Sequence, residues 1–467
     1  MSSDPVLDAF GRLAKRDSQA PLVVHGAGAA SRAEVDSLAA GVAANLAPLG
    51  LAPGCCILLT CVNGAGFLAA LLGARRAGLV PVLADWASPR AELARVAEAL
   101  GTAARIACAD VFPSGPAFLT IERCDVTPRI APEGAGYVKL TSGSAGSASG
   151  VAISSEALAA DDEQLAAAMG LVAADRFVAA IPWSHSYGLS SLVMPALRRG
   201  SMLIVPDDAS PWAPLAAART YQATVFPTVP VYLSTVGSLA APPPWPESLR
   251  TVISAGARLS PETASRLRDV FGLNAHVFYG ASESGGITYD REGGAASRGT
   301  VGTPIDGATI TLDPDGAVTV RGAALGSGYV PVEDERLRDG FFKSADLAAF
   351  TPDGELRLLG RADALINVGG KKVHPSEVEE VLRAMPGVSD AYVLGIPAEG
   401  DGRTIVRAFV ACDLDAVSYA NVASWCRERL AGHKIPRSIV RIATIPRTSR
   451  GKIDRAALAE FEPAADR

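Results

Sequence analysis

Short apolar segments alternate with alanine- and leucine-rich amphipathic segments through the first half of the 467-residue chain. The short segments have the length of buried strands, and the amphipathic segments have the length of helices. Strands and helices that alternate in this way build parallel sheets with helices on their faces. The pattern therefore predicts an α/β fold with strands at 56–61, 79–83, 177–181, 201–205, 224–226 and 251–254, and helices at 90–100, 155–169 and 211–220.

The sequence changes in character from about residue 297, where alternating strands follow one another through tight turns. Two Pro-Asp-Gly turns occur, at 314–316 and 352–354. Turns of this composition join neighbouring antiparallel strands. We expect a small antiparallel unit attached to the larger α/β body, with 309–312 next to 317–321 and 347–350 next to 355–359.

The segment after Gly360 contains enough elements for a domain of its own. They are a helix that opens at Pro375 and stops before Pro386, strands at 391–396 and 405–412, and a helix from Ser418 to Leu430. A segment of roughly 100 residues with its own core is a domain by size. We predict a large, multilayer N-terminal domain of mostly parallel sheets over residues 1–359 and a small α+β C-terminal domain over residues 360–467.

The charge balance excludes one class of partner, nucleic acid. Lys and Arg number 43 and Asp and Glu number 49, a net charge of −6, whereas domains that bind a phosphate backbone usually carry a basic excess. The mean hydropathy is high, at +0.22, and residues 55–74 carry no charge. Because Asn63, Gly64 and Gly66 interrupt that run, we expect a buried strand and a helix there and no membrane span.

Cysteine and histidine are too scattered to indicate a disulfide framework or a metal centre. The seven cysteines include no C-x-x-C pair, and the five histidines are isolated from one another. Reduced thiols in a cytoplasm are the natural interpretation. The N-terminus shows no basic region followed by an apolar stretch, so no secretion signal is expected.

A glycine- and serine-rich loop within residues 137–151 (YVKLTSGSAGSASGV) has the composition of a phosphate-binding loop. It follows a strand-like segment, and its small side chains leave backbone N–H groups and hydroxyls accessible to phosphate oxygens. A flexible connection is the commoner use of such a loop, and the G-x-x-x-x-G-K-[ST] pattern is absent from the chain. Both interpretations stay open on the loop alone.

Further motifs follow this loop in a characteristic order. The set consists of residues 141–146 (TSGSAG), 279–283 (YGASE), 344–346 (SAD), 360–370 (GRADALINVGG) and 446–452 (PRTSRGK). It resembles the signatures of the acyl-adenylate-forming superfamily, which contains acyl- and aryl-CoA ligases, peptide-synthetase adenylation domains and luciferases. Several spaced motifs in the right order are far less expected by chance than one loop.

The resemblance implies a two-step reaction of a small carboxylic acid with ATP, Mg²⁺ and CoA. A carboxylate attacks the α-phosphorus of ATP and displaces pyrophosphate, and a thiol then attacks the acyl-adenylate and releases AMP. The first step joins two anions, so it needs positive charge and oriented donors at the phosphates. By resemblance, Glu283 is the Mg²⁺ ligand, Ser282 donates to the α-phosphate, and Lys452 reaches the carboxylate and α-phosphate oxygens from a mobile domain.

The other site residues are assigned by the same resemblance. Asp346 is the expected ribose clamp, and the rest of the ATP-binding set is Thr141, Ser142, Gly143, Ser144, Gly146, Gly256, Tyr279, Gly280 and Arg361. Asp363 occupies the hinge about which the small domain turns, and Gly369 and Gly370 flank the channel for the CoA thiol. The expected acyl pocket consists of His185, Tyr187, Val229, Ala255, Gly280 and Ala281.

Taken singly, these residues also have plainer interpretations. Residues 279–283 fit a surface turn, Asp346 fits a cap at a turn, and His185 fits a packed core histidine. Lys452 lies among arginines and fits a solvated basic tail. No aspartate occupies the position that holds the α-amine in amino-acid adenylation domains, which makes an α-amino acid substrate less expected.

The phosphate loop departs from the family pattern, because residues 148–150 (ASG) replace Pro-Lys-Gly. The missing ammonium predicts weaker ATP binding, by roughly 1.5–3 kcal/mol. Ala345 in place of glycine is a milder change. Three functions stay open: a CoA ligase for a small aryl or acyl acid, a stand-alone adenylating enzyme that loads a carrier protein or activates another oxyanion, and an adenylate-binding protein without turnover.

Overall fold

The computed structural model describes residues 4–113, 119–141, 148–238, 244–368, 371–397, 404–447 and 453–461. The chain divides into two compact units. The first unit consists of Met1–Thr311, Thr319–Lys343 and Phe350–Leu356, and the second of Leu312–Val318, Ser344–Ala349 and Arg357–Arg467. The last segment begins close to Gly360, and two short earlier segments join it. A single boundary between residues 359 and 360 stays a prediction.

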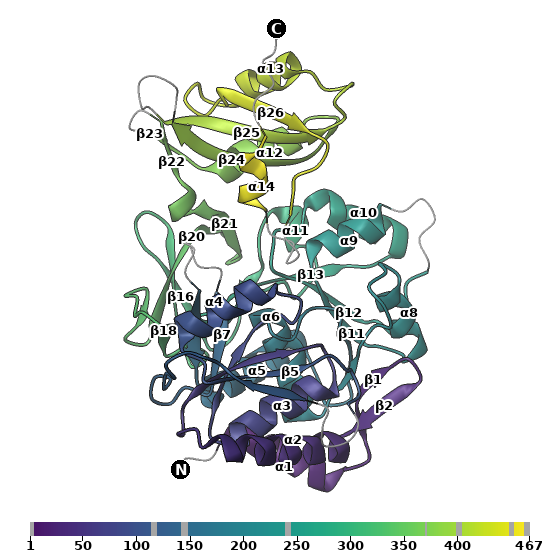
Figure 1. Ribbon diagram of the computed structural model, residues 1–467. Coiled ribbons are helices and arrows are strands. Elements are labelled where there is room, and N and C mark those ends of the chain that lie inside the picture. The colour runs from purple at the N-terminus through teal and green to yellow at the C-terminus, as the bar shows by residue number, and fades with distance from the viewer. Residues whose placement is uncertain are drawn as a thin grey trace. The chain divides into compact units, whose positions relative to one another are not determined.

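A nine-stranded sheet in the first unit has the order β15-β14-β13-β12-β11-β9-β10-β1-β2 (Figure 1). The run from β13 to β1 is parallel, and the pairs at both edges are antiparallel. The strands are β1 (Pro21–His25), β2 (Gly28–Ser31), β9 (Arg176–Val178), β10 (Met202–Ile204), β11 (Val225–Thr228), β12 (Thr251–Ser254), β13 (Ala275–Ala281), β14 (Gly285–Tyr289) and β15 (Thr303–Pro304).

A seven-stranded sheet in the same unit has the order β18-β8-β7-β4-β3-β5-β6. Its central strands, from β7 to β5, are parallel, and the outer pairs are antiparallel. The strands are β3 (Cys56–Cys61), β4 (Val80–Leu83), β5 (Ala104–Cys108), β6 (Thr120–Arg123), β7 (Tyr137–Thr141), β8 (Ser149–Ile153) and β18 (Gly328–Val330).

Both faces of these sheets are apolar because helices cover both. In β3, Ile57 and Leu59 join the core between the two sheets, whereas Cys56 and Leu58 face the opposite way. The helices of the shared core are α1 (Pro5–Arg16), α2 (Arg32–Leu46), α3 (Ala65–Arg76), α5 (Ser155–Met169) and α7 (Met194–Arg199), with the short turns η1 (Ala47–Leu49), α6 (Ser186–Gly188) and η2 (Leu189–Val193).

The outer faces of the two sheets carry separate cores. The outer face of the seven-stranded sheet packs against α4 (Arg90–Leu100). The outer face of the nine-stranded sheet packs against α8 (Ala213–Thr220), α9 (Pro230–Gly237), α10 (Pro261–Phe271) and α11 (Ala295–Arg298). Helix and sheet layers therefore alternate, as predicted for an α/β fold of mostly parallel sheets.

A third sheet has the order β16-β17-β20-β19, with β21 paired to β20. Both predicted Pro-Asp-Gly turns are present, since Gly316 N–H donates to the Asp313 carbonyl at 2.8 Å and Gly354 N–H to the Thr351 carbonyl at 3.0 Å. The strands, which are divided between the two units, are β16 (Ala308–Leu312), β17 (Ala317–Gly322), β19 (Leu337–Arg338), β20 (Phe341–Phe350) and β21 (Leu356–Arg361).

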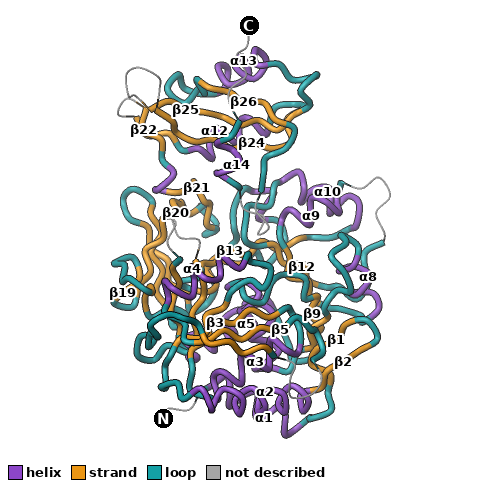
Figure 2. Tube along the Cα trace, viewed as in Figure 1, coloured by secondary structure: helices purple, strands orange, loops and turns teal. Residues whose placement is uncertain are grey.

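The second unit ends in a small α+β body, as expected (Figure 2). Its sheet β24-β25-β26 has one face against α12 and α13, while the other face packs against Leu458 of α14. The elements are η3 (Ala362–Ala364), β22 (Ile366–Val368), β23 (Lys371–Val373), α12 (Pro375–Arg383), β24 (Val388–Pro397), β25 (Thr404–Cys412), α13 (Tyr419–Arg429), β26 (Ser438–Ile442) and α14 (Arg455–Ala459).

The uncharged run at 55–74 forms β3 and most of α3, as the interrupting glycines predict. No helix among the described residues is long and apolar enough to span a membrane. All seven cysteines are free thiols, and six of them are buried. Burial raises the pKa of Cys56 and that of Cys426 to about 11, which keeps both thiols protonated at neutral pH.

Candidate active site

The turn between β13 and β14 carries Ser282 and Glu283 and closes with a hydrogen bond from Ser284 N–H to the Ala281 carbonyl (3.3 Å). Two glycines next to the turn permit the close approach of its strands. A Cβ on Gly280 would lie 2.6 Å from the Gly285 carbonyl oxygen, and Gly285 has a φ of +68°. Residues 279–283 therefore end a strand of the parallel core and form a tightly constrained turn.

Tyr329 fixes the carboxylate of Glu283. Its hydroxyl donates to Glu283 Oε1 at 2.7 Å, and Gly326 N–H donates to the Glu283 main-chain carbonyl at 2.7 Å. Burial and the neighbouring Glu283 charge both raise the pKa of Tyr329, so the phenol stays a neutral donor. Hydrogen bonds thus hold both the side chain and the main chain of Glu283.

Tyr329→Phe tests this contact. A hydrogen bond to a charged group is worth about 1.5–3 kcal/mol, so we expect a rise of about 10- to 100-fold in the Mg²⁺ concentration that half-saturates ATP–pyrophosphate exchange. Tyr232→Phe is the matched control, since that hydroxyl donates to the Pro211 carbonyl (3.0 Å). An unchanged Mg²⁺ dependence in Tyr329→Phe would show that Tyr329 does not position the carboxylate.

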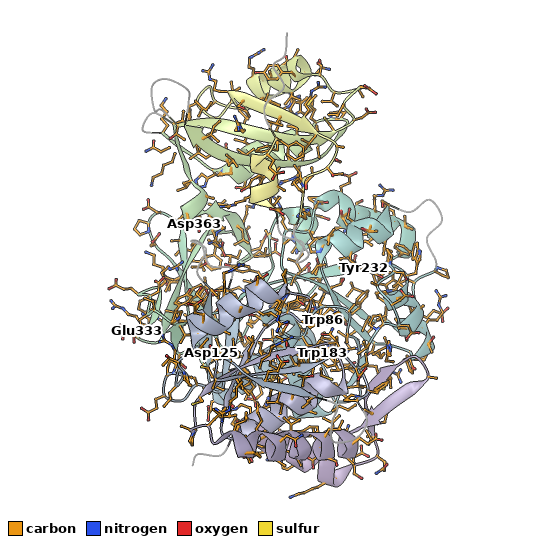
Figure 3. The ribbon with its side chains drawn as sticks, viewed as in Figure 1. Trp86, Asp125, Trp183, Tyr232, Glu333 and Asp363 are labelled. Carbon is orange, nitrogen blue, oxygen red and sulfur yellow. The ribbon has the colours of Figure 1, made fainter. Side chains whose placement is uncertain are left out.

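Ser282 meets a segment that precedes it by almost a hundred residues. The hydroxyl of Ser186 donates to the hydroxyl of Ser282 at 2.7 Å. Ser186 begins α6, directly after His185, and Trp183 anchors this segment by packing, fully buried, edge-on against Phe67 at 5.7 Å (Figure 3). The structure thus joins the predicted α-phosphate donor to the segment predicted to line the acyl pocket.

His185 lies next to an acidic partner that the sequence analysis did not identify. Its Nε2 is 3.7 Å from Oδ2 of Asp85, whose side chain is largely buried. Asp85 follows β4, at the carboxyl end of a parallel strand. In contrast, the hydroxyl of Tyr187 donates a hydrogen bond to the Ile253 carbonyl at 3.0 Å, and the Tyr187 ring lies 5.8 Å from that of Phe278. Tyr187 is therefore packed against the core of the first unit.

The other predicted pocket residues gather at one edge of the nine-stranded sheet. Val229, Ala255 and Ala281 stand at or just beyond the carboxyl ends of β11, β12 and β13, which are parallel neighbours. Ala255 N–H donates to the Thr228 carbonyl at 3.2 Å. Gly256 is exposed with a φ of +85°, and of the residues that the structure describes only Val229 comes within 4.0 Å of its Cβ position. Carboxyl ends of parallel strands are where ligands bind in open α/β sheets.

The predicted phosphate loop connects β7 to β8, an antiparallel hairpin in which Thr141 pairs with Ser149. The two hydroxyls are 2.9 Å apart. Ser154 caps α5, accepting from Ala157 N–H at 3.0 Å. Four of the predicted phosphate-binding residues lie outside the described residues: Ser142, Gly143, Ser144 and Gly146. The predicted site residues Gly369, Gly370 and Lys452 also lie outside them.

Asp346, Arg361 and Asp363 come together within the second unit. Arg361 holds both oxygens of Asp363, at 2.9 and 2.8 Å, and its Nη1 lies 3.3 Å from Oδ1 of Asp346 (Figure 3 labels Asp363). The hydrogen bonds from Arg361 lower the pKa of Asp363. Asp346 lies inside β20, where Ser344 donates to its Oδ2 at 3.1 Å. Because Asp346 lies within a strand, it does not cap a helix or strand, which was the plainer interpretation of this residue.

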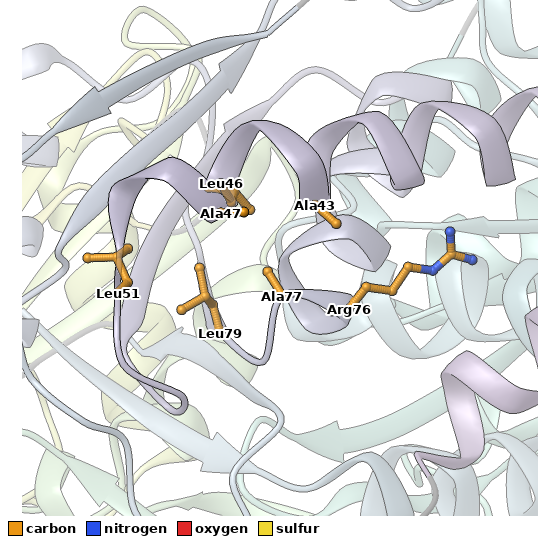
Figure 4. A pocket seen from close by; sticks show the side chains of 7 residues that line it. All are labelled: Ala43, Leu46, Ala47, Leu51, Arg76, Ala77 and Leu79. Carbon is orange, nitrogen blue, oxygen red and sulfur yellow. The ribbon is translucent and has the colours of Figure 1, made fainter.

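The donors present at Glu283 fit Mg²⁺ bound together with ATP. Among the described residues no group of three His, Cys, Asp or Glu side chains gathers to hold a metal alone. Mg²⁺ that is bound together with phosphates needs only one or two protein carboxylates, and Glu283, which accepts a hydrogen bond from the Tyr329 phenol, would supply one. The hollow between α2 and α3 in Figure 4 contains none of the predicted site residues, since it is lined by Ala43, Leu46, Ala47, Leu51, Arg76, Ala77 and Leu79.

Comparison with known proteins defines the class. The family model described as AMP-binding enzyme matches residues 10–330, and that of the AMP-binding enzyme C-terminal domain matches residues 377–452. The chain belongs to the AMP-binding enzyme family and so to the acyl-adenylate-forming superfamily. The class defined is that of adenylate-forming enzymes of the acid–CoA ligase type, which use ATP and CoA.

Similar proteins span most of the chain. A feruloyl-CoA synthase from an Amycolatopsis species is 29% identical over 95% of this chain and 96% of its own length. A salicyl-AMP ligase / salicyl-S-ArCP synthetase from Mycobacterium tuberculosis is 27% identical over 93% of this chain and 85% of its own. The structure of o-succinylbenzoate CoA synthetase from Bacillus subtilis with its acyl-adenylate intermediate has a TM-score of 0.83 at 21% identity, over 97% of this chain and 98% of that one. The last likeness supports the fold alone.

Proposed function

We propose that this chain activates a small aryl or acyl carboxylic acid with ATP and transfers the acyl group to CoA. The observation that carries the proposal is the arrangement at the 282–283 turn. There Tyr329 orients Glu283 and Ser186 orients Ser282 at the carboxyl end of a parallel strand. The feruloyl-CoA synthase from Amycolatopsis, which matches over 96% of its own length, supports an aryl-substituted acid as the substrate.

In the adenylation step, a carboxylate oxygen of the acid attacks the α-phosphorus, and the bond from that phosphorus to the pyrophosphate oxygen breaks. Mg²⁺ supplies charge neutralisation at the phosphates when it is bound. Glu283 would hold the ion, Ser282 would donate to an α-phosphate oxygen, and Lys452 would stabilise the charge that develops there. The hydroxyls of Thr141, Ser142 and Ser144 and the N–H groups near Gly143 and Gly146 bind the phosphates.

In the thiolysis step, the CoA thiol loses its proton, its sulfur attacks the acyl carbonyl carbon, and AMP leaves with the carboxylate oxygen. Asp363, held by Arg361, is the proposed hinge for this second pose, and Gly369 and Gly370 admit the pantetheine arm. The acyl group lies against His185, Val229, Ala255 and Ala281, and Oδ2 of Asp85 lies 3.7 Å from Nε2 of His185. Free thiols throughout fit a cytoplasmic location.

Asp346 is the proposed ribose clamp, since one carboxylate can accept from both ribose hydroxyls. Asp346→Asn should raise the KM for ATP about 10-fold and reduce the preference for ATP over 2′-deoxy-ATP. Initial rates with each nucleotide measure both effects. Asp353→Asn is a control at an exposed turn of the same hairpin and should leave both unchanged. The assignment is wrong if Asp346→Asn keeps the full preference for ATP.

A panel of acids with ATP and Mg²⁺, incubated with and without CoA and followed by mass spectrometry, tests the function. It should contain hydroxycinnamates, benzoates, dicarboxylates and fatty acids. Acyl-CoA from an aryl or short acyl acid is the expected product, and Glu283→Gln serves as the inactive control. Acyl-adenylate with no acyl-CoA would contradict CoA as acceptor, and a complete lack of ATP turnover would identify an adenylate-binding protein without catalysis.

A carrier protein is the second candidate acceptor. The relative from Mycobacterium tuberculosis whose name includes salicyl-S-ArCP synthetase favours it, because that match spans 93% of this chain. The same assay with a phosphopantetheinylated aryl carrier protein in place of CoA separates the two acceptors. Thioester on the carrier protein alone would replace CoA by the carrier in the proposed reaction.

A further inference from the structure

Lys139 is a charged residue in the interior of the first unit. It lies in β7 and is 1% exposed. Its Cα pairs are Leu83 of β4 and Val151 of β8, so it occupies a central position of the seven-stranded sheet. A buried ammonium costs several kcal/mol in lost hydration unless other groups compensate it. A strand covered on both faces normally carries an apolar residue at such a position.

The partners of Lys139 lie at the turn that carries Ser282 and Glu283. Its Nζ is 3.5 Å from the Ser282 main-chain carbonyl oxygen, which accepts the hydrogen bond. Burial lowers the pKa of Lys139, and the negative charges of Asp161 and Glu283 oppose that shift. The ammonium therefore approaches the same turn whose carboxylate is assigned to Mg²⁺.

Asp161, in α5, contacts the other end of this turn from the buried side. It is 1% exposed, and its Oδ1 accepts from Gly286 N–H at 2.9 Å. A Cβ on Gly285 would lie 2.3 Å from that oxygen, so the backbone and the carboxylate touch. The other oxygen, Oδ2, has no hydrogen-bond partner in the described part of the chain. Lys139 and Asp161 thus bring one positive and one negative charge to opposite ends of the turn.

Arg336, another charged residue near Glu283, has a half-exposed side chain that is paired with Asp334. The Arg336 guanidinium lies 5.5 Å from the Tyr329 ring centroid, and its Nη2 lies 2.6 Å from Asp334 Oδ2. Lys139 is the one buried lysine among the residues that the structure describes. The phosphate loop itself carries Ser149 where the family pattern has lysine, and Ser149 pairs across the hairpin with Thr141.

We propose that Lys139 is a positioning residue of the nucleotide site: from the buried side it holds the Ser282–Glu283 turn through the Ser282 carbonyl, while Asp161 holds the other end of the turn through Gly286 N–H. The inference rests on the proposed function. Because Lys139 is buried, it acts through Ser282 and Glu283 and does not contact the nucleotide.

Lys139→Met removes the charge and keeps the length of the side chain. Calorimetric titration with Mg²⁺ and the non-hydrolysable α,β-methylene analogue of ATP should show a dissociation constant about 10-fold higher than that of the wild type. At saturating preformed acyl-adenylate, thioester formation, which uses neither ATP nor Mg²⁺, should stay within about twofold. Lys15→Met, on the surface helix α1, is the matched control and should bind the analogue as the wild type does.

The double variant Lys139→Met/Asp161→Asn separates positioning from folding. It removes both buried charges, so its melting temperature should recover toward the wild-type value if Lys139→Met alone is destabilised. Binding of the magnesium–nucleotide analogue should nevertheless stay weak. Recovery of wild-type binding in the double variant, or unchanged binding in Lys139→Met, would overturn the inference.

The binding measurement needs no knowledge of the acid. If the wild-type chain fails to bind the magnesium–nucleotide analogue, the proposed function is wrong, and the inference falls with it. If the wild type binds and Lys139→Met binds equally well, only the role of Lys139 is wrong. Equal losses in nucleotide binding and in thioester formation would also contradict positioning, because they indicate a general loss of structure.

Discussion

Lys452→Ala is expected to lower acyl-adenylate formation by about 10²- to 10³-fold and to leave thioester formation from preformed acyl-adenylate within about twofold. The lysine stabilises charge on the carboxylate and α-phosphate oxygens only while the phosphorus is attacked. In the thiolysis step the thiol attacks a carbonyl carbon and the phosphorus is not attacked, so this stabilisation is not needed. ATP–pyrophosphate exchange reports the first step, and the rate of acyl-CoA formation from synthetic acyl-adenylate reports the second.

Lys434→Ala is the control for this variant. It removes a lysine of the same unit whose Nζ lies 2.7 Å from Glu377 Oε2. Both half-reactions of Lys434→Ala should match those of the wild type. Loss of both half-reactions to the same extent in Lys452→Ala would contradict the assignment, because a role in only one pose of the enzyme cannot affect both steps equally.

Glu283→Gln should lower the adenylation rate by about 10²-fold or more at physiological Mg²⁺. Glutamine keeps an oxygen that can accept from Tyr329 but loses the negative charge that a hard cation prefers. Raising the Mg²⁺ concentration should recover part of the rate. Pyrophosphate release measured across a Mg²⁺ series gives both the maximal rate and the concentration needed for half of it.

The exposed Glu333, labelled in Figure 3, offers a control of the same chemistry. Glu333→Gln should show the wild-type Mg²⁺ dependence. The assignment of Glu283 as the metal ligand fails if Glu283→Gln loses rate equally at all Mg²⁺ concentrations, since the loss would then come from a step that does not involve the ion.

The layered α/β body could be predicted because apolar strands and amphipathic helices differ in period. Residues 90–100 and 155–169 form helices with the predicted bounds, and 251–254 forms the predicted strand. The strand predicted at 177–181 ends at Val178. Beyond it the chain leaves the sheet, and Asn63 Nδ2 donates to the carbonyls of Ala179 and Ile181 at 3.3 and 2.9 Å.

The motifs located the 282–283 turn but not the groups that orient it. Ser186 is 96 residues from Ser282, and Tyr329 is 46 residues from Glu283. Neither a serine before Tyr187 nor a tyrosine in a three-residue strand carries a local signal. Their meeting depends on the order of strands in two sheets, which periodicity does not determine. The carboxyl ends of β11, β12 and β13 share one edge of the sheet, and this edge is where ligand-binding residues are expected in an α/β fold.

Two charged partners were missed for a different reason. Asp85 follows strand β4, and Lys139 lies inside strand β7. A strand is recognised in the sequence by its apolar residues, so a charged residue in or next to it attracts no attention. The sequence does contain one indication of a buried charge: Lys139 stands between Val138 and Leu140 in an otherwise apolar strand segment. A charge at a buried strand position implies a compensating group, and here that group belongs to the nucleotide turn.

Oxygen-18 labelling of the carboxylic acid tests the central claim, that the acid attacks the α-phosphorus. With the acid selected from the panel carrying ¹⁸O in both carboxylate oxygens, one labelled oxygen becomes the bridge of the acyl-adenylate and leaves with AMP. Mass spectrometry after turnover with ATP, Mg²⁺ and CoA should therefore find one ¹⁸O in the phosphoryl group of AMP. ADP with ¹⁸O in inorganic phosphate, or unlabelled AMP, would contradict an acyl-adenylate intermediate.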